Sequence, residues 1–169
     1  YEYSYSYAIV DYYSDNCEYE IQLPPGYYYM LMEFNMSYGR SKKFDVRLEH
    51  YTVREFMGKE MKGLAVALYL ENGETGQYDI LSGLITKNFC EYIGYKNTAY
   101  IDLNNSPFAT ELLQRGLAVD TGFHKDSGFC KYPLWEFKEE FLKQIGEEKY
   151  KQYSDEYDKY MKEMFSPDE

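Results

Sequence analysis

Two short motifs that carry the residue types of an acid–base site lie close together in the second half of the chain. Asp120-Thr121-Gly122-Phe123 is echoed by Asp126-Ser127-Gly128-Phe129. Both match the Asp-Thr/Ser-Gly signature of aspartic proteases, whose two carboxylates lie about 3 Å apart and share one proton. Such a dyad unites carboxylates from two separate lobes or subunits, which one short segment cannot reproduce. We therefore interpret both motifs as turns in which Asp bonds its own backbone and Gly adopts a positive φ.

The same segment offers a cysteine nucleophile and a base, because His124 lies between the motifs and Cys130 follows them. No recognisable spacing supplies an orienting group or an oxyanion hole, so the sequence predicts no catalytic residue. A small hydrolase that uses residues 120–130 stays an alternative. We expect no metal and no cofactor, because the possible ligands form no short-range chelating pair: Cys17, Cys90, Cys130, His50 and His124.

Size and composition predict one globular domain over residues 1–169. Hydrophobic residues make up 44% and charged residues 28% of the chain, which is ordinary for a globular protein. The 22 tyrosines are unusual, since each buried ring must bring its hydroxyl to water or to a hydrogen-bond partner. We therefore expect many half-buried tyrosines, and tyrosines also suit protein interfaces.

The first part of the chain, residues 1–103, is predicted to form mainly strands. Tyrosines alternate with polar residues at the start, and residues 71–76 have the composition of a hairpin turn. The segments that read as strands are rich in aromatic and aliphatic residues: 1–7, 27–38, 44–51, 63–70, 78–86 and 97–103. They predict an antiparallel, aromatic-rich sheet.

The second part, residues 104–169, is predicted to be mainly helical, with a loop at 117–132. Ser106 as N-cap, Pro107 at the first helical position and Gly116 after the last turn delimit one helix. Pro133 opens another helix, and residues 147–165 form either a further helix or its continuation across a kink at Gly146. The predicted fold class is therefore α+β, with the C-terminal helices packed on the sheet.

In the last helix, apolar side chains recur every three or four residues, which is the spacing of a coiled-coil seam. The residues are Tyr150, Tyr153, Tyr157, Tyr160 and Met164. This seam either packs on the protein's own sheet or pairs with another chain. The second interpretation predicts a homodimer and a structural or regulatory subunit.

The charge balance of 18 basic against 29 acidic residues gives a net charge of −11, which disfavours binding to a phosphate backbone. The negative excess is spread along the chain, either as a solubilising surface or as an acidic face for a basic partner. One basic cluster, with Tyr38 and Phe44 as possible stacking rings, is interpreted as a solvated turn rather than a single-strand binding site. It consists of Arg40, Lys42, Lys43 and Arg47.

The number and spacing of the three cysteines indicate neither a disulfide framework nor a zinc ribbon, which favours a reducing cytoplasm. No apolar run is long enough to span a bilayer, and no signal peptide is recognisable, so no membrane association is expected. Because the chain starts at Tyr1 without an initiator Met, we expect that its native start is missing.

Three blocks carry a resemblance to a known family: residues 100–113 (YIDLNNSPFATELL), 120–123 (DTGF) and 132–137 (YPLWEF), with 51–56 (YTVREF) as the opening. Over roughly residues 50–145 the chain resembles an uncharacterised domain family of small accessory proteins from conjugative elements and phages of gut bacteria. The resemblance implies a genetic setting and supplies no catalytic residue.

In that setting the acidic composition predicts a non-enzymatic interaction protein that inhibits a host defence nuclease of the CRISPR or restriction type. Such nucleases hold nucleic acid in basic channels, which an acidic protein can occupy, including by nucleic-acid mimicry. The predicted partner is therefore a basic protein such as a host nuclease complex. The predicted partner-binding residues lie on the last helix: Glu147, Glu148, Tyr153, Asp155, Glu156, Asp158 and Glu163.

Overall fold

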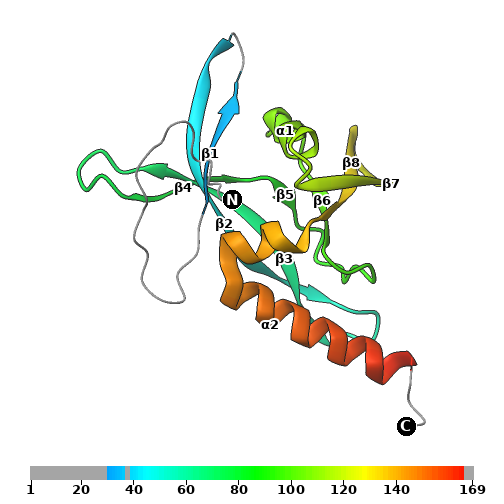
Figure 1. The fold of residues 1–169 in the computed structure, drawn as a ribbon. Helices are drawn as coiled ribbons and strands as arrows, with labels where there is room; N and C mark the ends of the chain where they lie inside the picture. The colour runs from blue at the N-terminus through cyan, green and yellow to red at the C-terminus, as the bar shows by residue number, and fades with distance from the viewer. Residues whose placement is uncertain (1–29, 37–38, 166–169) are drawn as a thin grey trace.

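The computed structural model describes residues 30–36 and 39–165, and it confirms the α+β class (Figure 1). Its strands form two four-stranded sheets, and all the pairings within them are antiparallel. The predicted strand at residues 1–7 lies outside the described residues, as does Tyr38. The other predicted strands are present, with bounds shifted by a few residues.

The first sheet has the strand order β1-β2-β3-β4. Its members are β1 (Met30–Asn35), β2 (Ser41–Arg54), β3 (Glu60–Glu71) and β4 (Tyr78–Leu84). The predicted hairpin turn at residues 71–76 is confirmed: Asn72 Oδ1 accepts from Glu74 N at 2.9 Å, and Gly76 has a φ of 76°. The β3–β4 hairpin projects away from the body of the molecule (Figure 1).

The second sheet has the order β5-β6-β8-β7 and corrects two predictions. It contains β5 (Thr86–Lys87), β6 (Thr98–Ile101), β7 (Ala118–Ser127) and β8 (Cys130–Phe137). The expected loop at 117–132 is instead most of a hairpin, and Pro133 lies in a strand rather than at a helix start. Proline is tolerated there because Pro133 faces His124, at a position where the ladder requires no N–H from it.

The predicted helix after residue 104 begins as the 3₁₀ turn η2 (Pro107–Ala109) and continues as α1 (Thr110–Gln114). Ser106 occupies the N-cap position and Pro107 begins the helix, as predicted, although the Ser106 side chain makes no capping hydrogen bond. Gly116 ends the helix as predicted, with a φ of 74° and its N–H donating to the Leu113 carbonyl.

The C-terminal helix α2 (Glu139–Phe165) packs on β2 and β3. Its regular geometry is interrupted at Gly146, where the Cβ atom of any other residue would lie 2.8 Å from Leu48 Cβ. The two helical parts therefore meet where the helix backbone lies against Leu48 of β2.

The main core lies between the two sheets and α2 and contains residues from all of them. Ile85 connects the sheets, because its N–H donates to Val66 O of β3 at 2.9 Å and its carbonyl accepts from Asp102 N at 2.8 Å. Aromatic rings fill much of the space, including Phe34, Phe44 and Trp135.

Candidate interaction surfaces

The tyrosine seam of α2 is the inner face of the helix. Tyr150, Tyr153, Tyr157 and Tyr160 are all buried, with successive contacts between neighbouring rings and Tyr92. Packing on the protein's own sheets is therefore the correct one of the two interpretations, and these rings are not available to a second chain. Burial raises the pKa values of Tyr92 and Tyr153 far above the ordinary value.

The predicted partner-binding residues on α2 divide into three groups. Glu147, Glu148 and Glu163 are exposed, and their side chains make no hydrogen bond or ion pair within residues 30–36 and 39–165. Asp155 and Asp158 are exposed but paired, with Lys151 Nζ at 2.7 Å and Lys96 Nζ at 2.9 Å.

The other two predicted residues of α2 hold the helix in place. Glu156 Oε1 accepts from Lys62 N of β3 at 2.7 Å. The hydroxyl of Tyr153 accepts from Asn97 N at 2.9 Å, and only 5% of this residue is exposed. The prediction that Tyr153 contacts a partner is therefore wrong, because its ring is buried and its hydroxyl is hydrogen-bonded within the chain.

The acidic surface that the sequence analysis missed is the β3–β4 arm, which we define as residues 69–81. It carries Glu71, Glu74 and Asp79, all exposed and without an ion pair or a side-chain hydrogen bond among the described residues. No Lys or Arg occurs between Lys62 and Lys87. This stretch without basic residues is visible in the sequence and could have indicated an acidic surface. Only the structure shows that the arm projects from the body of the molecule and exposes its carboxylates (Figure 1).

The arm also exposes apolar side chains on its edge strand. Ile80 is 46% and Leu81 is 58% exposed, although they are neighbours in β4 and point to opposite faces of it. Both faces of this end of β4 are thus open to solvent. These apolar side chains can supply contact area to a partner, while the neighbouring carboxylates can pair with its basic residues.

The 120–130 segment forms an exposed hairpin. Asp120 Oδ1 accepts from Gly122 N at 2.9 Å, and Gly122 and Gly128 have φ angles of 90° and 61°, as predicted for turns. His124 Nε2 lies 3.6 Å from Asp126 Oδ1, and both side chains face solvent. Two hollows in the surface are lined by residues of other segments.

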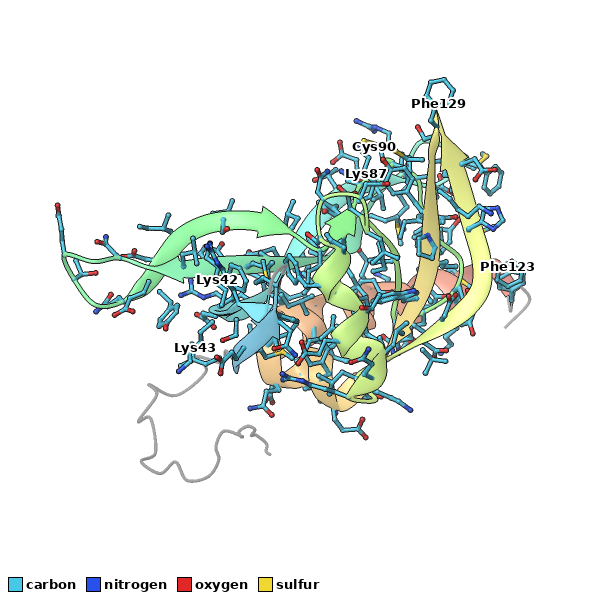
Figure 2. All side chains as sticks on the ribbon, turned by 90° about the horizontal axis from the view of Figure 1, so that it is seen from above. Lys42, Lys43, Lys87, Cys90, Phe123 and Phe129 are labelled. Atoms are coloured by element: carbon cyan, nitrogen blue, oxygen red, sulfur yellow. The ribbon has the colours of Figure 1, made fainter. Side chains whose placement is uncertain are left out.

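Two phenylalanines of this hairpin were missed as surface residues. Phe129 at the tip is fully exposed, and Phe123 on β7 is 65% exposed. Figure 2 shows Phe129 beyond the end of the hairpin and Phe123 on the side of β7 away from β8. Their signal in the sequence was the Gly-Phe dipeptide that ends each turn motif.

The basic cluster does not form a stacking platform. Lys42 and Lys43 are exposed at the start of β2 (Figure 2), but Phe44 is buried against Phe34 and Phe108. Arg47 pairs with the buried Asp45 at 2.6 Å. Although Lys42 Nζ lies 5.7 Å from the centre of the Phe44 ring, only 2% of Phe44 is exposed, so this ring cannot stack on a base.

The remaining candidates are the cysteines and the other possible metal ligands. Cys90 is exposed and Cys130 is partly exposed, whereas Cys17 lies outside the described residues. Within the part of the chain that the structure describes, no group of three His, Cys, Asp or Glu side chains is arranged to hold a metal ion. No helix among these residues is long and apolar enough to cross a membrane.

Comparison with family models gives a match over residues 50–160 to a family described as Domain of unknown function (DUF4313). The chain belongs to this family. The expected resemblance to an uncharacterised domain family is therefore confirmed. The DUF4313 match includes the β3–β4 arm, the β7–β8 hairpin and α2 up to Tyr160, but not Glu163. Neither the curated proteins nor the solved structures contain a match to the chain.

Proposed function

We propose that this chain is a non-enzymatic binding protein that engages a basic surface of another protein. The observation that carries the proposal is the β3–β4 arm, where Glu71, Glu74 and Asp79 are exposed and unpaired and no Lys or Arg is interspersed. Unpaired carboxylates on a projecting element attract a basic partner and orient its approach.

The solvent side of α2 adds a second acidic surface. Glu147 and Glu148 begin the helix beyond Gly146 and are unpaired, and Asp155 follows about 10 Å further along the axis at 1.5 Å per residue. That distance corresponds to about three phosphates along one DNA strand, at roughly 3.4 Å each. Lys151 and Lys159 lie between and beyond these carboxylates. The helix therefore fits a basic protein surface through complementary charge better than it imitates the regular charges of a phosphate backbone.

The partner class that we propose is a nuclease complex of a host defence system, of the CRISPR or restriction type, and the gene setting is a mobile element. Support comes from the resemblance to accessory proteins of conjugative elements and phages, together with the acidic surfaces. Nucleases of this kind keep a basic channel for nucleic acid, where arm carboxylates would compete with phosphates.

The test compares cleavage of target DNA by purified CRISPR effectors and restriction nucleases in the presence and absence of the full chain. Inhibition at about 50 mM salt that weakens strongly at about 200 mM is expected, because exposed ion pairs are screened. Absence of inhibition and of binding for every nuclease at low salt would contradict the proposed partner class.

Two matched variants locate the surface. One changes Glu71, Glu74 and Asp79 to Lys, and the other changes Glu147, Glu148 and Glu163 to Lys. Both reverse three unpaired carboxylates, so they alter the net charge equally. We expect the arm variant to lose inhibition and the helix variant to weaken it less. Equal losses would show that only net charge matters, which would contradict a role for the arm.

A further inference from the structure

The tip of the β7–β8 hairpin determines which backbone groups face outward. Gly128 occupies the first central turn position with a φ of 61°, and Phe129 occupies the second without a positive φ, as in a type II′ turn. In a two-residue hairpin the flanking residues, Ser127 and Cys130, exchange both of their backbone hydrogen bonds. Along β7, the inward and outward positions then alternate.

This alternation places the N–H and C=O groups of His124 and Asp126 on the side of β7 away from β8. His124 faces Pro133, which has no N–H to donate, so this pair belongs to the set that exchanges no backbone hydrogen bonds. β7 is the last strand of its sheet. Within the described part of the chain, no strand pairs with this edge.

The first half of the same edge is occupied by its own side chains. Asp120 Oδ1 accepts from Gly122 N at 2.9 Å, and Thr121 Oγ1 accepts from Phe123 N at 3.2 Å. The pairing with β8 is irregular over this stretch. A local bulge of this kind blocks strand addition, so the open part of the edge is confined to residues 124–127.

Exposed aromatic side chains stand at both ends of this open part. Phe123 precedes it and Phe129 follows it, and both point away from the body of the sheet (Figure 2). A strand laid along residues 124–127 would find one ring at each end. Large aromatic side chains of this kind act as anchors when a partner covers them.

The charges beside the open edge define the chemistry of the partner. Asp126 is 68% exposed in its side chain and shares one face of β7 with His124. Lys125 points to the opposite face, where its Nζ lies 2.9 Å from Glu91 Oε1 and over the ring of Phe89. Lys125 is thus paired within the chain. Lys131 of β8 is exposed and lies opposite Asp126 in the ladder, on the side of β7 away from the open edge. The exposed carboxylates beside the open edge are those of Asp120 and Asp126.

We infer that the outer edge of β7 at residues 124–127 accepts an extended, basic segment of another protein as an additional strand. Main-chain groups of His124 and Asp126 pair with the segment, and Phe123 and Phe129 pack on its apolar side chains. Its Lys or Arg residues face Asp126. Strand addition of this type depends on the backbone and tolerates many sequences. The inference concerns a different surface from the arm and stands independently of the proposed function.

The test uses the full chain, labelled for NMR, and a capped peptide of about ten residues that alternates valine and lysine. We expect saturating peptide to slow hydrogen exchange of the His124 and Asp126 amides by about tenfold or more, with little change at Lys125 and Ser127. A peptide with glutamate in place of lysine is expected to bind at least about tenfold more weakly.

Two substitutions at one position separate backbone from side chain. His124→Pro removes the outward N–H without removing a hydrogen bond to β8, and His124→Ala removes only the side chain. The proline variant is expected to lose about tenfold or more in peptide affinity, and the alanine variant to retain it. The emission of the buried Trp135 reports whether each variant is folded.

Three results would overturn the inference. The first is no binding of the lysine peptide to the folded wild-type chain. The second is equal affinity of the proline and alanine variants. The third is protection of the His124 and Asp126 amides that rises with protein concentration in the absence of peptide, since a second copy would then occupy the edge.

Discussion

Tyr150 and Asn97 are joined by a hydrogen bond that ties the C-terminal helix to the second sheet, with the Tyr150 hydroxyl donating to Asn97 Oδ1 at 2.9 Å. The backbone of Asn97 makes two further bonds: its N–H donates to the Tyr153 hydroxyl, and its carbonyl accepts from Phe137 N. Asn97 has a φ of 66°, a conformation that asparagine tolerates better than most residues. One residue thus connects two tyrosines of α2 with the end of β8.

Substitutions of Asn97 should therefore separate its side chain from its backbone conformation. Asn97→Gly removes the acceptor for Tyr150 and should cost about 1 kcal/mol of unfolding free energy. Asn97→Ala removes the same acceptor and also places a residue with a Cβ atom, but without the tolerance of asparagine, at a positive φ. This should add roughly 1–2 kcal/mol to the loss of unfolding free energy. Urea unfolding followed by Trp135 fluorescence measures both. Equal stability of the two variants would contradict a role for the backbone conformation.

Gly146 is required because of its contact with β2. A Cβ atom at this position would lie 2.8 Å from Leu48 Cβ, so Gly146→Ala should destabilise the fold by about 1–3 kcal/mol through overpacking. Gly83→Ala is the control, since a Cβ there meets no atom within 4 Å. In a double-mutant cycle, Gly146→Ala with Leu48→Gly should cost less than the sum of the single changes, because glycine at position 48 lacks the Cβ atom that the new methyl group would meet. Additive costs would show that the contact is not the cause.

His50 should make stability depend on pH. Its Nε2 lies 2.8 Å from Lys149 O, and burial is the main cause that lowers its pKa below the ordinary 6.5. The hydrogen bond to the Lys149 carbonyl and the charge of Glu156 oppose this shift, whereas the positive charges of Lys149 and Lys62 add to it. Because the folded pKa is below the unfolded one, the stabilisation is present above pH 6.5 and is lost as the pH falls through the folded pKa.

The measurement is urea unfolding at several pH values between about 5 and 7.5, for wild type and for His50→Gln. Glutamine can still donate to the Lys149 carbonyl but does not titrate, so the variant should lose less stability on acidification. If both proteins show the same pH slope, His50 is not the group responsible.

The end of α2 is joined to the β2–β3 turn by Tyr160, whose hydroxyl donates to Glu55 Oε2 at 2.8 Å. Glu55 is buried, and the backbone N–H of Lys59, followed by the Tyr160 hydroxyl, holds its pKa below the ordinary value. Tyr160→Phe leaves this acceptor with one partner fewer and should lower Tm by roughly 2–4 °C. Tyr95→Phe removes a bond to Glu136 at an exposed site and should have a smaller effect. Equal shifts would contradict the importance of burial.

The sequence determined those features that depend on local chemistry. Alternating apolar runs and the turn at residues 71–76 predicted β2, β3 and β4, and Gly116 predicted the end of α1, because side-chain periodicity and positive φ are properties of short segments. The regular spacing of the tyrosines predicted a helix with one packed face. The net charge and the wide spacing of the possible metal ligands were also evident from the sequence alone.

Tertiary structure decided what depends on partners distant in the chain. Pro133 became part of a strand because Trp135 and Phe137 fill the core and the hairpin partner needs no N–H from the proline. Tyr153 became a buried contact rather than a surface residue because Asn97, far away in sequence, supplies its partner. The open edges of β4 and β7 likewise follow from which strands lie last in each sheet, a property of pairing that no local segment encodes.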